Sequence, residues 1–238
     1  MLFKKNTLAV CIISSNPDLL RISLPPLGRL GKNFTAIIYN TNPEITLTKS
    51  DVRAMGYSGP TEIINAQAVT GKIVAVAETI KHITEMKNRP AWVIFLNECD
   101  MLISDELPDV STAHCAVIQN AVEINSDLGI LMRVLANPAK FETDGKNVIH
   151  RAPAGDIFGI LIRTDALISA CTAISNLALG LRQEKPAQAA KMDDTSVIWQ
   201  IIRDAARADN STPIYMDRVN RIKINSNFGS KKQKSKNI

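Results

Sequence analysis

The chain has 238 residues, 45% of them hydrophobic and 21% charged, with a formal net charge of +5 at pH 7. These values are typical of a globular protein with one large core or two small ones. No apolar run approaches the roughly 20 residues that a membrane-spanning helix needs, which argues against a transmembrane segment. The first 13 residues lack the features of a signal peptide, so we expect a cytoplasmic protein.

The cysteines and the charge exclude further classes. The four cysteines follow neither a zinc-binding pattern nor a CxxC redox pattern, and they imply no disulfide framework. Nine basic and three acidic residues lie between Arg203 and the C-terminus, a net charge of +6, which leaves about −1 for residues 1–202. The excess positive charge therefore belongs to the C-terminal region. We expect one domain over 1–225 and a disordered basic tail over 226–238, which either contacts an anionic surface of lipid or nucleic acid or only aids solubility.

In chain order, the first half alternates strands with helices, and this alternation predicts a mostly parallel sheet flanked by helices. The expected elements are a strand over 7–13, a short or kinked helix over 18–30, strands over 34–39 and 61–66, a helix over 72–86 and a strand over 92–96. Pro25 and Pro26 are the reason for the kink. We expect His82, in the second helix, on its solvent side.

The second half is more mixed. It predicts strands over 127–135 and 157–163, helices over 165–181 and 194–207, and a short strand from Tyr215 onward. Trp199, in the second of these helices, is expected in the core. The fold class is therefore α/β.

The most informative stretch is 91–103, AWVIFLNECDMLI, where an apolar strand ends abruptly in polar and acidic residues. The carboxyl end of a strand in an open α/β sheet is where ligands bind, and carboxylates there can hold a hard cation. The alternative is an ordinary turn with surface acids.

The order of these pieces resembles the GT-A glycosyltransferases, particularly the family 2 type, over roughly residues 7–205. Five segments carry the resemblance: AVCIISSNPDLLRISLPPL, AIIYNTNPE, AVTGKIVAVAETI, WVIFLNECDML, and GDIFGILIRTDAL followed by MDDTSVIWQII. The resemblance implies a Rossmann-like nucleotide-diphospho-sugar transferase fold and transfer of a sugar from a nucleotide-activated donor, by default a UDP-sugar, with inversion.

The resemblance also implies roles for particular residues. Glu98 and Asp100 would hold a divalent metal, Mn²⁺ or Mg²⁺, that neutralises the diphosphate leaving group. Asp193 or Asp194 would take the proton from the acceptor hydroxyl, although either could equally cap the helix that follows. Residues expected to bind the nucleotide are Ser14, Asn16, Asn40, Gly71, Lys72 and Glu98.

The sequence departs from the family at two places. Asn97 or Cys99 stands where the metal motif has aspartate, so either Cys99 or Asp100 occupies the metal position, and a thiolate there would suit softer metals. Asn40 or Asn42 replaces the acid that usually meets the uracil base.

Three functions follow as alternatives. The first is a glycosyltransferase acting on a glycan or a lipid-linked precursor. The second is a bacteriophage-type enzyme that glycosylates a hydroxymethylated base in DNA, with the basic C-terminal region on the phosphates. The third is a non-catalytic binding module with a GT-A-like fold, which the departures at Asn97 and Cys99 favour.

Overall fold

The structure of the protein is a computed structural model. It describes residues 8–28, 34–102, 115–124, 151–152, 156–184, 194–211 and 213–224. The expected strand over 127–135, the catalytic candidate Asp193 and the basic tail lie outside these ranges.

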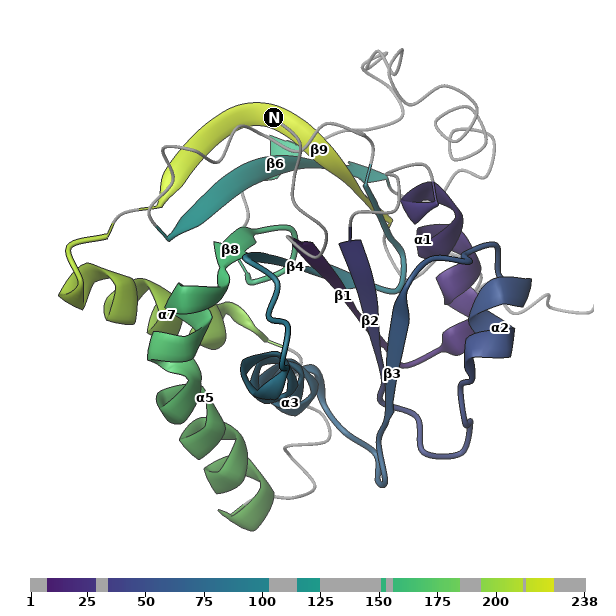
Figure 1. The fold of residues 1–238 in the computed structure, drawn as a ribbon. Helices are drawn as coiled ribbons and strands as arrows, with labels where there is room; N and C mark the ends of the chain where they lie inside the picture. Colours follow the sequence, from purple (N-terminus) through teal and green to yellow (C-terminus); the bar gives the residue numbers. More distant parts are fainter. Residues whose placement is uncertain are drawn as a thin grey trace, which may run out of the picture.

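The described strands form one nine-stranded sheet in the order β3-β2-β1-β4-β8-β6-β9-β5, with β7 paired to β6 (Figure 1). Their bounds are β1 Leu8–Ser14, β2 Phe34–Asn40, β3 Thr61–Asn65, β4 Trp92–Asn97, β5 Asp100–Leu102, β6 Ala116–Ile124, β7 Arg151–Ala152, β8 Leu161–Arg163 and β9 Ile214–Ile224. The first four strands are parallel, and β8 pairs antiparallel with β4. The expected α/β fold with a mostly parallel sheet flanked by helices is confirmed.

Helices cover both faces of the parallel part of the sheet. Their bounds are the 3-10 helix η1 Pro17–Leu19, α1 Leu20–Leu27, α2 Lys49–Ala54, α3 Lys72–Glu85, α5 Thr164–Glu184 and α7 Ser196–Ala208. Figure 1 shows α1 and α2 on one side of the sheet and α3, α5 and α7 on the other. Successive strand residues point to opposite faces, so the apolar strands β1, β2 and β4 supply side chains to both layers.

Two hydrophobic cores result. The core under α3, α5 and α7 includes Cys11, Ile37 and Phe95, whereas the core under α1 and α2 includes Val10 and Ile38. Trp199 lies in the first core at 5% exposure, as predicted. The helix α3 buries the apolar face that its sequence indicates.

Most element boundaries in the first half agree with the sequence. Pro25 and Pro26 lie inside α1, which has only eight residues. The second half differs more: β6 was not predicted, and β9 is an eleven-residue strand rather than a short one. Both are built from long-range pairing with each other, and Figure 1 shows them arching together over one end of the sheet.

Among the described residues, one segment, Thr164–Gln183 of α5, is long and apolar enough by composition to cross a membrane. This is weak evidence for a span, because the core helix of a globular protein passes the same test. Leu167, Ala170 and Ile174 on this helix are buried in the core shared with α3 and α7.

Candidate functional site

The strand order creates a switch point between β1 and β4. The chain places β2 and β3 on one side of β1 and then crosses to place β4 on the other side. The carboxyl ends of two such strands diverge into loops that run to opposite faces, and ligands of open α/β sheets bind in that crevice. Here these ends are Ser14 and Asn97, so the predicted site residues that follow them lie at this switch point.

Glu98 reaches across this switch point. Its Oε2 accepts the backbone N–H groups of Ser15, at 2.5 Å, and Asn16, at 3.1 Å. Its Oε1 accepts the Ser15 hydroxyl at 3.0 Å. The turn after β4 is thus tied directly to the turn after β1.

Asp100 closes the turn in which Glu98 lies. It is 1% exposed, and its Oδ2 accepts the backbone N–H of Asn97 at 3.0 Å. Asp100 also begins β5, which pairs antiparallel with β9. The carboxylate is therefore built into the β4–β5 turn.

Cys99 is a buried thiol between these two acids. Burial, followed by the negative charges of Glu98 and Asp100, raises its pKa from 9.0 to about 11, and the charge of Lys72 opposes this shift. Because α3 follows the carboxyl end of β3, its beginning lies at the same end of the parallel sheet as the β4–β5 turn.

Gly71 and Lys72 form the beginning of α3. Gly71 is the N-cap residue and provides no side-chain hydrogen bond to the helix, and Lys72 is partly buried. A helix N-terminus presents unpaired N–H groups and a positive partial charge, and a lysine adds a full one. This end of α3 suits a phosphate group.

Ser14 and Asn40 face each other in the β1–β2 register, and both are completely buried. The Asn40 amide donates to the backbone oxygens of Asn42 and Ile45 and to Asn65 Oδ1, and its Oδ1 accepts the Asn42 N–H. Asn40 therefore organises the loop after β2, and none of its surface is open to a ligand in this structure.

Asn16 is exposed, and its side-chain oxygen accepts the Asp18 N–H to cap η1. Of the residues predicted to bind the nucleotide, the structure thus brings Asn16, Lys72 and Glu98 to one end of the sheet with accessible surface. Ser14 lies at the same end as a buried part of the strand.

Asp194 lies directly before Thr195, which is the N-cap residue of α7 and makes no side-chain cap hydrogen bond, so the sequence interpretation of Asp194 as the N-cap was wrong. Asp194 is exposed, and its Oδ1 accepts the Ser196 N–H at 3.0 Å. Hydrogen bonds from Ser196 hold the Asp194 pKa below its ordinary 3.8, so the carboxylate is ionised at neutral pH. Its role as a base stays a prediction.

The described carboxylates do not fit a metal site. Within the described part of the chain, no group of three or more His, Cys, Asp or Glu side chains is arranged to hold a metal ion. Glu98 already accepts three hydrogen bonds, and Asp100 is buried in its turn. A hard cation needs several open oxygen ligands, so we assign no catalytic step to a metal.

Two features of this region were not predicted. Ser15 was not among the predicted site residues, yet it supplies two of the three donors to Glu98. Tyr39, at the end of β2, donates to Glu78 of α3, which pairs with Arg182 of α5 at 2.6 Å. A distant acid and its donors leave no local pattern in a sequence.

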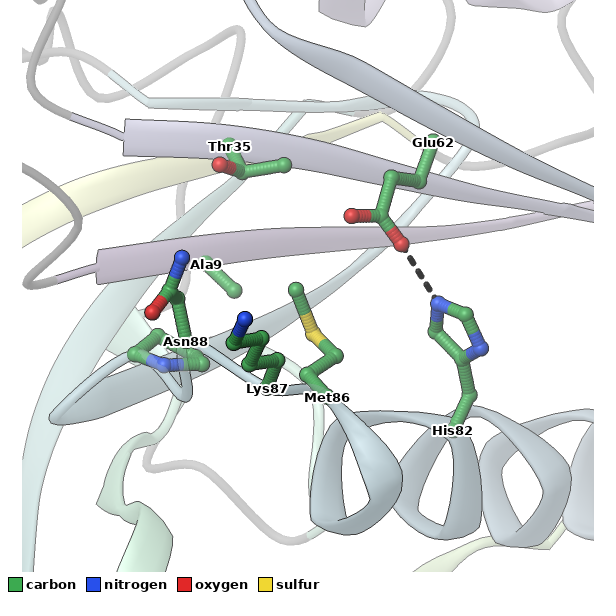
Figure 2. Close-up of a pocket in the computed structure, with 8 residues that line it drawn as sticks. Ala9, Thr35, Glu62, His82, Met86, Lys87 and Asn88 are labelled. Carbon is green, nitrogen blue, oxygen red and sulfur yellow. Dashed lines mark hydrogen bonds and ion pairs between the residues drawn. The ribbon is translucent and has the colours of Figure 1, made fainter.

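A cavity of about 410 Å³ lies at the opposite, amino end of the sheet (Figure 2). Its lining residues are Ala9, Thr35, Glu62, His82, Met86, Lys87, Asn88 and Pro90. His82, expected on the solvent side of its helix, is 38% exposed, and its Nε2 lies 2.5 Å from Glu62 Oε2 of β3. The sequence interpretation missed this pair because it depends on where α3 crosses the sheet.

No protein-family model matches the chain, and a search of curated proteins found no match. Among solved structures, it is similar to S. aureus TarS 1-349, with a TM-score of 0.52 and 10% identity over 91% of this chain. It spans 60% of the length of that TarS chain.

Two further structures show lower similarity. The nucleoside-diphosphate-sugar pyrophosphorylase from Vibrio cholerae RC9 has a TM-score of 0.47 and 11% identity, with 91% of this chain and 92% of that chain covered. HddC from Yersinia pseudotuberculosis has a TM-score of 0.36 and 8% identity, with 67% and 78% covered. The match to TarS shows that this chain shares the fold of that structure over most of its length.

Proposed function

We propose that the protein transfers a sugar from a nucleotide-activated donor, by default a UDP-sugar, to a hydroxyl acceptor. The carrying observation is that the turn after β1 is hydrogen-bonded to the β4–β5 turn at the switch point of a GT-A-like fold, and that α3 begins at the same end of the sheet. The structural likeness to TarS, over 91% of this chain, supports a GT-A-like fold and with it this reaction class.

The residues at this end supply the groups that the reaction needs. The beginning of α3 and Lys72 face the negative charge of a diphosphate, and Asn16 offers an exposed amide to the nucleoside. The acceptor oxygen bonds to the anomeric carbon as the bond to the diphosphate breaks, and the nucleoside diphosphate leaves with that electron pair. An ionised carboxylate near the acceptor, Asp193 or Asp194, takes the hydroxyl proton.

Inversion is part of the proposal, because a single displacement of this kind reverses the configuration at the anomeric carbon. A divalent cation, Mn²⁺ or Mg²⁺, would neutralise the diphosphate when bound. The described carboxylates do not complete its site, so the positive charge that this chain itself provides is that of Lys72 and the α3 N-terminus.

The first test is a thermal-shift screen of nucleoside diphosphates, each with Mn²⁺, with Mg²⁺ and without metal. A ligand that binds only the folded state raises the melting temperature by mass action. We expect one nucleotide to raise it and so identify the donor base. Absence of a shift with every nucleotide and metal would contradict the proposal.

A second candidate is a non-catalytic binding module. The observation that favours it is that Glu98 and Asp100 are both engaged in turns rather than open to a metal. Measuring the turnover of a nucleotide-sugar distinguishes an enzyme from a binding module. An enzyme loses turnover in Asp193→Ala or Asp194→Ala while its nucleotide shift persists, whereas a binding module shows no turnover in any form.

The acceptor in this proposal is a glycan or a lipid-linked precursor, with the basic tail on the anionic surface. Transfer should then fall when residues 226–238 are removed and vesicles of anionic lipid carry the acceptor. Transfer to DNA containing hydroxymethylated bases, and none to the other acceptors, would instead establish the DNA-modifying alternative.

A further inference from the structure

From its place in the sequence, Glu98 could either bind a metal ion or form part of the nucleotide site. Its contacts in the structure distinguish these two roles. Its carboxylate is 83 residues from Ser15 along the chain, yet it accepts from both the N–H and the hydroxyl of Ser15. It also accepts the next backbone N–H, that of Asn16. These contacts span the two turns that border the switch point.

The turn after β1 needs such an acceptor. β1 ends at Ser14, so the N–H groups of Ser15 and Asn16 fall beyond the strand ladder. η1 begins at Pro17, so these two N–H groups precede the helix and have no carbonyl acceptor within it. Two adjacent donors pointing the same way are a site for one anionic oxygen, and Oε2 of Glu98 occupies it.

The acceptor capacity of Glu98 is largely used by these contacts. A carboxylate oxygen has two lone pairs, and Oε2 accepts two hydrogen bonds while Oε1 accepts one. Binding a metal through Oε2 would displace a backbone donor. The geometry suits a fixed acceptor better than a metal ligand.

We propose that Glu98 is a positioning residue that holds the Ser15–Asn16 turn in place at the donor site, and that it is not a ligand of a metal ion. The proposal rests on the proposed function for the identity of that site. The contact between the two turns stands on its own and can be tested without any ligand.

Two substitutions distinguish the roles. In Glu98→Gln, the amide oxygen can still accept both backbone N–H groups, and the NH₂ can donate to the Ser15 hydroxyl, which also accepts. In Glu98→Ala, all three contacts are lost. A metal ligand would be lost in both variants, because an amide is a poor substitute for an anionic ligand of a hard cation. Glu85→Ala is the control, since Glu85 is 64% exposed at the far end of α3.

Amide hydrogen exchange at Ser15 and Asn16, measured by NMR on the full chain, tests the contact directly. We expect Glu98→Ala to speed exchange at both amides by roughly tenfold or more, the usual effect of losing a hydrogen bond to a charged group. Glu98→Gln should stay within about threefold of the parent, and Glu85→Ala should match it. Unchanged exchange in Glu98→Ala, or equal acceleration in Glu98→Gln, would overturn the proposal.

Nucleotide affinity, measured with and without Mn²⁺, tests the consequence. We expect Glu98→Ala to weaken binding by about tenfold in both conditions and Glu98→Gln to bind within about threefold of the parent. Loss of the Mn²⁺-dependent part of the affinity in both variants would make Glu98 a metal ligand and overturn the proposal. If no nucleotide binds the parent, the proposed function fails, and the exchange rates still decide the role of Glu98.

Discussion

The two ends of the parallel sheet use polar residues in different ways. At the carboxyl end, Glu98 and Asp100 accept hydrogen bonds from backbone N–H groups of neighbouring turns, and the Asn40 amide donates to backbone oxygens. At the amino end, the half-exposed side chains of Glu62 and His82 contact each other at the rim of a cavity. The first set holds loops in place, and the second pairs two side chains in the presence of water.

This difference predicts different energetic weights. A buried polar group that satisfies backbone donors leaves those donors unpaired when it is removed, which costs more than the bond itself contributes. An exposed ion pair leaves both partners free to be hydrated, so its loss costs little. Residues of the same type at the two ends therefore offer matched comparisons.

The largest expected difference is between two asparagines. Asn40→Ala removes a fully buried amide that holds the loop after β2, and we expect it to lower the free energy of unfolding by about 2–4 kcal/mol. Asn88→Ala, at the exposed rim of the cavity, should change it by less than about 0.5 kcal/mol. Urea denaturation measures both, and equal losses would contradict the comparison.

The next effect is that of Asp100. Asp100→Ala leaves the Asn97 N–H without its carboxylate acceptor, and we expect a loss of about 1–3 kcal/mol of unfolding free energy. Its control, Glu85→Ala, removes an exposed carboxylate whose nearest cation, that of Lys81, lies 3.9 Å away, and should cost about 0–0.5 kcal/mol. If Glu85→Ala destabilised the protein as much as Asp100→Ala, the place of a carboxylate in the fold would not determine its contribution to stability.

A smaller effect is expected for the ion pair at the amino end. Glu62→Gln should cost about 0–1 kcal/mol, because both side chains are 38% exposed. The two side chains form an ion pair only when His82 is protonated, and in that form most of this difference should disappear at 1 M salt, where charges on the surface are screened. Thermal unfolding at low and high salt would check it, and a salt-independent loss above 2 kcal/mol would place the pair among the structural contacts.

The smallest effect on stability is that of Cys99 at neutral pH. The pKa of Cys99 is about 11 in the folded chain and 9.0 for an ordinary thiol, so the folded state holds the thiol proton more tightly than the unfolded state. The resulting contribution to stability is fully present below pH 9 and is lost as the pH rises toward 11. At pH 8 the thiolate fraction is about 100-fold lower than that of an ordinary thiol, so alkylation should be correspondingly slow. Mass spectrometry of alkylated peptides, folded against urea-unfolded, measures the ratio; a ratio near one would be inconsistent with this buried position.

Local patterns were sufficient for the first half of the chain. The helical spacing of apolar residues in 72–86 and the apolar run at 92–96 predicted α3 and β4 almost to their ends. Pro25 and Pro26 correctly indicated a short α1, because proline limits a helix wherever it occurs. Such signals depend only on neighbouring residues.

The second half shows where local patterns stop. β6 was missed, and β9 runs to eleven residues, since the two strands are defined mainly by pairing with each other across some 100 residues of chain. Strand formation depends on such partners more than helix formation does. The resemblance to GT-A enzymes anticipated the fold but not these pairings.

The candidate site divides in the same way. The sequence by itself determined which polar and acidic residues follow the strands, and hence that Asn16, Lys72 and Glu98 lie at one end of the sheet. Only the tertiary structure decided that Glu98 accepts from Ser15 and Asn16, that Asn40 is buried, and that Glu62 faces His82. The physical reason is that strand order and the crossing of α3 set these distances, and both depend on contacts between residues far apart in the chain.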